Sequence, residues 1–309
     1  MNEGARAIKD EVAKVIVGKD DIIEKALAAI LAGGHVLLED LPGVGKTTLA
    51  LAFSRVMGLE FNRVQFTPDV VPSDITGFSM YDKQSGQFSY KPGAAMCNFF
   101  LADEINRTSS KTQSALLEVM QEGKMTVDGQ AHFAPQPFIV MATQNPIGTA
   151  GTQMLPEAQL DRFMMQMSMG YPDKRAQVKI LMDRDNKEPL DEISQVCDLN
   201  EIIQMKNRTS NIYFDEKVMR YVVDLAEATR ASELTRLGVS PRGALSLMSM
   251  GKAYAFVQGE SFVTPDTIRA VFLDVCRHRI ILNGKAHLEE KTKDEILSEI
   301  IARIEPPIR

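Results

Sequence analysis

The sequence lacks the features of a secreted, membrane-spanning or nucleic-acid-coating protein. It has three cysteines, Cys97, Cys197 and Cys276, which lie far apart without a CxxC pair, so neither a disulfide framework nor a zinc knuckle is expected. Its apolar runs are far too short to span a bilayer, and its charged first residues lack the apolar core of a signal peptide. The net charge of -6 disfavours binding to nucleic acid or anionic lipid. We therefore expect a cytoplasmic protein without membrane insertion.

Short apolar strands alternate with helical patterns in the first part of the chain, which predicts a parallel sheet covered by helices on both faces. Strands are expected at 35–39, 61–66, 97–104, 137–146 and 163–169. Helices are expected at 3–15, 20–32, 47–57 and 111–123.

The patterns become nearly all helical after the segment Tyr171–Pro172, where we place a domain boundary. Helices are expected at 174–184, 198–206, 215–231, 241–257, 265–278 and 291–304. Their expected N-caps include Asp215, Ser240 and Thr264. The sequence thus predicts an α/β domain over residues 1–172 and a small helical domain over residues 173–309.

Two segments interrupt the strand–helix alternation. Residues 77–93 alternate polar and apolar side chains around a Ser-Gly turn, and residues 124–134 carry Asp-Gly between two strand-like runs. Both patterns predict β-hairpins. Neither hairpin is needed to complete the sheet, and additions of this kind to a rigid scaffold are common places for function.

The stretch PGVGKT, between a predicted strand and a predicted helix, indicates a phosphate-binding loop. Gly43 and Gly45 allow the backbone to curl around phosphates, Lys46 can reach the outer phosphates, and Thr47 supplies a hydroxyl group for Mg²⁺. Asp40 occupies the position where the general pattern has its first glycine. That position lies at the strand end, so we expect Asp40 to be tolerated, with its carboxylate pointing away from the phosphates.

Polar side chains follow two of the other predicted strands. Asp103 and Glu104 end the strand NFFLADE, and in nucleotide hydrolysis such a pair holds the Mg²⁺ shell and deprotonates water. Asn145 ends the fourth strand, where an amide can hold the attacking water. Taken alone, each pattern is also typical of a solvated strand end, a helix cap or a turn.

Two arginines are candidates for stabilising the transferring phosphoryl group. Arg162 precedes the fifth strand, where the alternative is a surface pair with Asp161. Arg242 begins a helix, where a cation is unfavourable without an anionic partner. The four histidines lack ligand spacing, so a metal site of protein ligands alone is not expected. The absence of an N-K-x-D element favours adenine over guanine.

Together these motifs resemble those of the MoxR-type AAA+ ATPases. The matching segments are VIVGKDD, PGVGKT, RVQFTPDVVPSDITG, FFLADEINR, LLEVMQEG, ATQNP, LPEAQLDRF and SPRG, and they extend over nearly the whole chain. Members of this family often carry a residue other than glycine at the position of Asp40. The resemblance implies an AAA+ P-loop αβα domain with a five-stranded parallel sheet, followed by a small all-helical lid.

The resemblance also implies roles for individual residues. The catalytic set would be Lys46, Glu104, Asn145 as sensor 1, and Arg162 as an arginine finger acting on ATP in the neighbouring subunit. Arg242 would be sensor 2, in its own subunit or in trans. The remaining ATP contacts would come from Val15 to Gly18 around adenine and from the phosphate loop, giving the set Ile16, Val17, Gly18, Pro42, Gly43, Val44, Gly45, Lys46, Thr47 and Thr48. Thr47 and Asp103 would hold Mg²⁺.

The function implied by the resemblance is Mg²⁺-dependent ATP hydrolysis by a homo-oligomeric ring, usually a hexamer. Such rings assemble or activate protein clients, often proteins with a von Willebrand factor A domain or metal-dependent enzymes, and the two hairpins would face the pore or a partner. The alternatives are a nucleic-acid motor, the motor subunit of a metal chelatase, and a nucleotide-binding switch with negligible turnover. The lysines of the hairpins are isolated, which disfavours the nucleic-acid motor.

Overall fold

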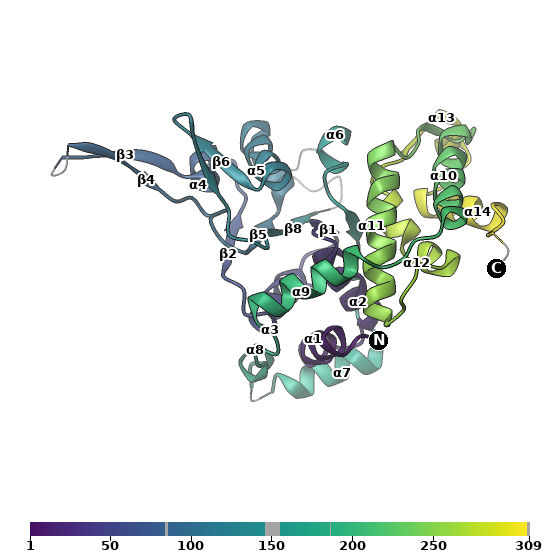
Figure 1. Ribbon diagram of the computed structural model, residues 1–309, viewed down its shortest axis with the longest axis horizontal. Coiled ribbons are helices and arrows are strands. Elements are labelled where there is room, and N and C mark those ends of the chain that lie inside the picture. The colour runs from purple at the N-terminus through teal and green to yellow at the C-terminus, as the bar shows by residue number, and fades with distance from the viewer. Residues whose placement is uncertain (84–85, 146–154, 186, 308–309) are drawn as a thin grey trace.

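A five-stranded sheet lies at the centre of the computed structural model, which describes residues 1–83, 86–145, 155–185 and 187–307 (Figure 1). All neighbouring strands are parallel, in the order β2-β5-β8-β1-β9. The strands are β1 (Val36–Glu39), β2 (Phe61–Gln65), β5 (Phe99–Asp103), β8 (Ile139–Gln144) and β9 (Met165–Met167). The predicted sheet is therefore confirmed, with each strand slightly shorter than the sequence pattern.

Helices cover both faces of the sheet. Alternate side chains of a strand point to opposite faces, and the apolar ones on each face are buried by helices. Leu38 and Leu101 pack in one apolar core with α1, α2 and α3, whereas Leu37 and Phe100 pack in a second core with α5. These helices are α1 (Glu3–Ala13), α2 (Asp20–Leu31), α3 (Lys46–Val56) and α5 (Ser110–Glu122). The short elements α4 (Pro72–Thr76), the 3₁₀ turn η1 (Ile105–Arg107) and α6 (Glu157–Leu160) were not predicted.

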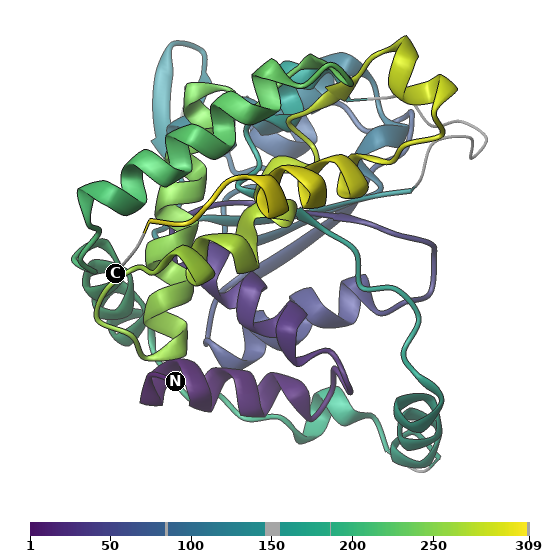
Figure 2. The same cartoon turned by 90° about the vertical axis from the view of Figure 1, so that its right-hand side faces the viewer.

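The C-terminal part of the chain is helical, and most of it gathers on the side of the molecule that Figure 2 views face-on. Its helices are α7 (Lys174–Asp183), α8 (Pro189–Glu192), α9 (Leu199–Ser210), α10 (Glu216–Ala231), α11 (Pro241–Gln258), α12 (Pro265–Cys276), α13 (Gly284–Leu288) and α14 (Lys293–Arg303). The side chains of Asp215, Ser240 and Thr264 accept hydrogen bonds from first-turn N–H groups, as the cap predictions require.

One small sheet interrupts these helices. Strands β10 (Thr235–Leu237) and β11 (Ile281–Leu282) pair in antiparallel fashion. Each strand has only two or three residues, too few to show an alternating pattern in the sequence, so the sequence predicted only helices in this region.

Among the described residues no helix combines the length and apolar character needed to cross a membrane.

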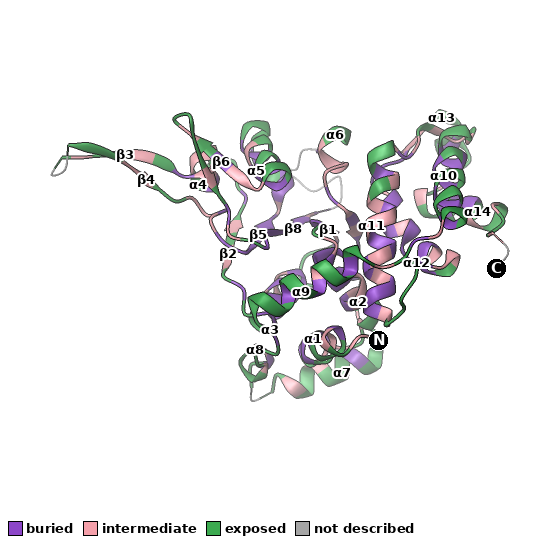
Figure 3. Ribbon diagram, viewed as in Figure 1, coloured by how far each residue is buried: buried purple, intermediate pink, exposed green. Residues whose placement is uncertain are grey.

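Both predicted hairpins are present and both lie outside the sheet. The first consists of β3 (Phe78–Asp82) and β4 (Gln87–Lys91), which extend away from the body of the molecule (Figure 1). The second consists of β6 (Lys124–Val127) and β7 (Gln130–Phe133). The rings of Tyr90 and His132 stack with centroids 3.6 Å apart, so the two hairpins are packed against each other. Much of their surface is exposed (Figure 3).

Candidate functional site

The carboxyl ends of the central strands meet at one edge of the sheet, where ligands bind in open α/β folds. Parallel register places Gln65 beside Asp103 and Glu39 beside Gln144. A cavity of about 620 Å³ opens at this edge, between the loop before α3, the loop after α1, and helix α7. This volume lies within the usual range for small-molecule sites.

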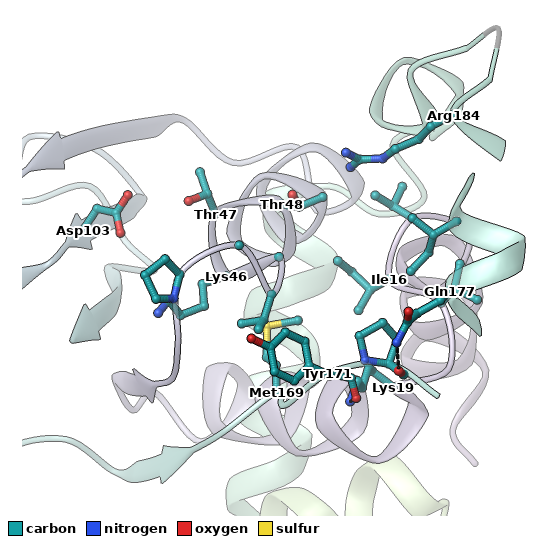
Figure 4. A pocket seen from close by; sticks show the side chains of 18 of the residues that line it. Ile16, Lys19, Lys46, Thr47, Thr48, Asp103, Met169, Tyr171, Gln177 and Arg184 are labelled. Atoms are coloured by element: carbon teal, nitrogen blue, oxygen red, sulfur yellow. Dashed lines mark hydrogen bonds between the residues drawn. The ribbon is translucent and has the colours of Figure 1, made fainter. Parts of the chain in front are cut away.

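One end of the cavity is polar and charged, and the other is mostly apolar, although Lys19, Gln177 and Arg184 also lie there (Figure 4). The charged end is formed by the phosphate loop together with Arg63, Gln65, Asp103, Glu104 and Asn145. The side chains that give the other end its apolar character are Val15, Ile16, Val17, Met169, Tyr171, Pro172, Ile180 and Leu181. A ligand with a flat apolar part and an anionic part fits this division, because each part meets surface of matching polarity.

The predicted phosphate loop connects β1 to α3 and lines the cavity from Pro42 to Thr48. Gly43 and Gly45 have φ values of 85° and 98°, which residues with a side chain rarely adopt. Helix α3 begins at Lys46 without a side-chain cap, so its first N–H groups are available to an anion. The curled backbone and the helix N-terminus therefore have the geometry of an anion-binding loop.

Lys46 is held by main-chain oxygens of this loop. Its Nζ donates to the carbonyl oxygen of Asp40 at 2.6 Å and to that of Leu41 at 3.2 Å. Burial lowers the pKa of Lys46, while the carboxylates of Asp40 and Asp103 oppose that shift. A bound phosphate would offer the ammonium group a charged partner in place of these two carbonyl groups.

Asp103 is fixed by one hydroxyl group and one guanidinium group. Its Oδ1 accepts a hydrogen bond from the Thr143 hydroxyl at 2.6 Å, and its Oδ2 accepts one from Arg63 Nη2 at 2.7 Å. The main-chain N–H of Glu104 in turn donates to the Thr143 oxygen at 2.8 Å. The sequence analysis did not find Arg63. Its role depends on the pairing of β2 with β5, which the sequence does not record.

Glu104 is held at both carboxylate oxygens. Oε1 accepts from the Asn145 amide at 3.0 Å, and Oε2 accepts from Arg107 Nη1 at 2.7 Å. Burial alone would raise the pKa of Glu104, but the hydrogen bonds from Arg107 and Asn145 outweigh it and lower the pKa. Glu104 also has a φ of 56°, a left-handed conformation that is uncommon outside glycine. The strand end thus presents an ionised carboxylate next to a neutral amide.

The residues expected to contact Mg²⁺ fit that ion. Thr47 and Asp103 both line the charged end of the cavity, and the Asp103 carboxylate already has a cationic partner in Arg63. Mg²⁺ in nucleotide sites is typically held by one or two carboxylates together with phosphate oxygens and water. In the described ranges no cluster of three or more His, Cys, Asp or Glu side chains forms a metal site of protein ligands alone.

Three of the predicted residues do not line the cavity. Gly18 does not line the cavity, although Ile16, Val17 and Lys19 around it do. Arg162 also lies outside the lining, and its Nη1 donates to the carbonyl oxygen of Leu117 at 2.7 Å. Arg242, in the first turn of α11, likewise does not line it.

The segment that carries Arg162 is joined to α11 and α12. Asp161 pairs with Arg279 at 2.8 Å rather than with Arg162, and Ser240, the N-cap of α11, donates to Asp161 at 3.2 Å. Arg279 is only 5% exposed and also donates to the carbonyl oxygen of Phe163 at 2.7 Å. Arg162 and the start of α11 are therefore held in one assembly of side chains, apart from the cavity of their own chain.

Comparisons with known proteins agree with this fold. The ATPase family associated with various cellular activities (AAA) matches residues 35–165, and the AAA lid domain matches residues 227–300. The chain is 43% identical to the uncharacterized protein YeaC of Bacillus subtilis, covering 97% of this chain and 94% of that protein. It is 37% identical to the chaperone MoxR1 of Mycobacterium tuberculosis, covering 96% and 81% respectively.

Two further similar proteins also match nearly the whole chain. Protein MoxR of Methylorubrum extorquens is 30% identical, with 98% of this chain and 94% of that protein covered. A crystal structure of a protein from Cytophaga hutchinsonii that is assigned as an ATPase superimposes with a TM-score of 0.91 at 36% identity. That superposition covers 99% of this chain and 95% of the other.

Proposed function

The chain belongs to the MoxR-type AAA+ ATPases, and from that premise we propose that it hydrolyses ATP to ADP and phosphate with Mg²⁺ in order to remodel protein clients. The observation that carries the proposal is the charged end of the cavity. There, a glycine loop with its lysine faces an ionised Glu104 that is held beside Asn145.

The polarity of the cavity orients the nucleotide. The phosphates lie in the loop from Pro42 to Thr48, and the adenine ring lies against Ile16, Val17 and the other apolar residues. Lys46 leaves the carbonyl oxygens of Asp40 and Leu41 and binds the outer phosphates. Thr47 and Asp103 would hold Mg²⁺, which would supply positive charge beside the phosphates.

Glu104 and Asn145 act on the attacking water. Asn145 positions the water through its amide, and Glu104 accepts the proton as the oxygen attacks the γ-phosphorus. Arg107 donates to Oε2 at 2.7 Å and lowers the Glu104 pKa, so Glu104 is a stronger base once this contact is released. The contact between Arg107 and Glu104 therefore belongs to the state before ATP and water are in place.

Arg162 and Arg242 act on a neighbouring subunit. Both are candidates for stabilising phosphoryl charge, and neither lines the cavity of its own chain. A homo-oligomeric ring would bring them to the ATP of the next subunit, and six subunits are what we expect from the family. Asp161, which neighbours Arg162, bonds both Arg279 and Ser240, the N-cap of the helix that carries Arg242. These contacts would fix the positions of Arg162 and Arg242 relative to each other.

The two hairpins present an apolar surface suited to protein clients. Phe88 and Phe133 are 74% and 73% exposed, and Phe78 and Tyr81 of the first hairpin are about half exposed. The described part of each hairpin carries isolated lysines rather than a basic cluster, which favours a protein over nucleic acid. We propose cytoplasmic clients with a von Willebrand factor A domain, or metal-dependent enzymes that need maturation.

A client trap tests this proposal. Tagged Glu104→Gln protein is loaded with ATP and Mg²⁺ in lysate of its own cell, and co-purifying proteins are identified by mass spectrometry. Lys46→Ala protein, which should not hold ATP, serves as the control. A von Willebrand A-domain protein or metalloenzyme bound only by Glu104→Gln would support the proposal. Recovery of nuclease-sensitive nucleic acid and its binding proteins alone would contradict it.

A further inference from the structure

Asp40, which stands where the general phosphate-loop pattern has a glycine, joins the loop to the segment after β9. Its Oδ2 accepts hydrogen bonds from the Gly170 N–H at 2.7 Å and from the Ser168 hydroxyl at 2.9 Å. Its Oδ1 accepts from the N–H of Leu41 at 2.9 Å. Asp40 is buried and does not line the cavity, so its carboxylate faces the exit of β9 rather than the ligand.

The segment that Asp40 holds carries part of the apolar end of the cavity. Met169 and Tyr171 flank Gly170, and both line the cavity (Figure 4). Gly170 has a φ of 57°, and its N–H donates to Asp40 from this left-handed turn. A second contact fixes the far side of the segment, where Lys19 Nζ donates to the carbonyl oxygen of Tyr171 at 3.0 Å.

The chemistry of these contacts requires an ionised carboxylate. Burial alone would raise the pKa of Asp40, but hydrogen bonds from Gly170 and Ser168 outweigh it and lower the pKa. Hydrogen bonds to an ionised acceptor are about twice as strong as neutral ones. Glycine at this position would remove all three contacts, whereas asparagine could keep an uncharged oxygen toward Gly170 and Ser168 only by turning its NH₂ group toward the Leu41 N–H.

We propose that Asp40 is a positioning residue that fixes the base-side wall at Met169 and Tyr171 relative to the phosphate loop. The inference rests on the proposed nucleotide site. It adds that Asp40 contributes to the affinity of this site for the nucleoside part of the nucleotide. The phosphates are bound by the loop itself, whereas the base is bound between the loop after α1 and the wall that Asp40 holds.

Calorimetric binding of ADP and of inorganic pyrophosphate, each with Mg²⁺, separates these two contributions without any turnover. Asp40→Gly, which loses the contacts to the segment 168–170, should weaken ADP binding by about tenfold, the effect of losing one hydrogen bond to a charged group, and Asp40→Asn, which can keep an uncharged acceptor there, by a smaller factor. Pyrophosphate binding should change by less than about twofold, because removing a nearby negative charge does not harm an anion site. Ser168→Ala, which removes a single contact, should weaken ADP binding by a smaller factor.

The matched control is Glu39→Gln. Glu39 precedes Asp40, and its carboxylate also opposes the lowering of the Lys46 pKa, but it bonds Gln144 and Gln166 instead of the segment 168–170. Its ADP affinity should remain that of the wild type, and thermal melting should show that every variant is folded.

Three results would count against the inference. Equal losses of ADP and pyrophosphate binding in the Asp40 variants would mean that Asp40 acts on the phosphate loop. Unchanged ADP binding in those variants and in Ser168→Ala would mean that the contacts do not position the wall. Failure of the wild type to bind ADP would instead contradict the proposed function and remove the basis of the inference.

Discussion

The side-chain amide of Asn145 donates a hydrogen bond to Oε1 of Glu104 at 3.0 Å, although 41 positions separate the two residues in the chain. Glu104 follows β5 and Asn145 follows β8, and these strands are parallel neighbours in the sheet. Strand register therefore brings the proposed base and the proposed water-binding amide together. The hydroxyl of Thr143 supports the arrangement by bonding both Asp103 and the N–H of Glu104.

Removal of Arg107 should change the pH dependence of turnover. The Arg107 guanidinium lowers the pKa of Glu104, so Arg107→Ala should raise that pKa. Because the proposed base acts in its ionised form, the acid limb of the kcat/KM profile, which reports the enzyme before ATP binds, should move to higher pH. Rates of phosphate release across the acidic range measure this shift. An acid limb at the wild-type position would show that Glu104 does not govern it.

Mixing of two inactive variants tests whether Arg162 acts on the neighbouring subunit. Arg162→Ala and Lys46→Ala should each be inactive alone, and an equal mixture should recover part of the ATPase rate. In the mixture, a Lys46→Ala subunit supplies its Arg162 to the ATP held by an Arg162→Ala neighbour.

A mixture of Lys46→Ala with Glu104→Gln is the matched control, because both defects affect the cavity of the same chain, and it should recover nothing. Size-exclusion chromatography of differently tagged subunits shows whether mixed oligomers form. Mixed oligomers without recovered activity would contradict action in trans.

Loss of Asp161 should destabilise the fold. Arg279 is buried, and removal of its carboxylate partner leaves an uncompensated charge, which typically costs about 3–5 kcal/mol. Asp161→Ala should therefore lower the urea midpoint markedly. Glu216→Ala, which breaks the exposed pair with Arg220, should leave the midpoint nearly unchanged. Equal midpoints for Asp161→Ala and wild type would show that the buried pair does not secure the segment of Arg162.

His35 should make stability depend on pH. It is buried, its Nδ1 accepts from the N–H of Val140 at 3.0 Å, and its Nε2 bonds the carbonyl oxygen of Met120 at 2.9 Å. Burial lowers its pKa to about 4, below the value of about 6.5 in the unfolded chain. Stability from neutral His35 is thus fully present above pH 6.5 and is lost as the pH falls toward 4.

The loss over that range should be on the order of 3 kcal/mol. His35→Asn keeps an acceptor for Val140 but does not titrate, so its stability should fall less between those pH values. Urea unfolding of both proteins at several pH values measures the difference, which isolates His35 from the other titrating groups. Parallel curves for the two proteins would exclude His35 as the source.

The sequence predicted those parts of the fold and the site that depend on short local patterns. The phosphate loop, the Asp103–Glu104 strand end and the turn at Asp128–Gly129 each lie within a few consecutive residues. Asp128 and Gly129 have φ values of 51° and 79°, as the hairpin turn requires. Strands β1 and β5 were recognisable because buried parallel strands are continuously apolar, whereas the edge strand β2 mixes apolar and polar residues.

The features that the sequence did not reveal depend on contacts between distant segments. Arg63 reaches Asp103 through the pairing of β2 with β5, and Arg279 reaches Asp161 across 118 positions. The role of Asp40 likewise depends on Gly170, which lies 130 positions away. A single sequence records no register between such segments, so it did not single out Arg63 or Arg279, and Asp40 was expected only to be tolerated. The predicted domain boundary at Tyr171–Pro172 and the oligomeric state remain predictions.

The measurement that tests the account most directly is phosphate release by Glu104→Gln compared with wild type, together with ATP affinity. Glutamine keeps the shape of Glu104 and its contact with Asn145 but cannot accept a proton. The account predicts wild-type ATP affinity and a kcat reduced by about a hundredfold or more, the usual contribution of a general base. A kcat equal to that of the wild type would contradict the assignment of Glu104 as the base.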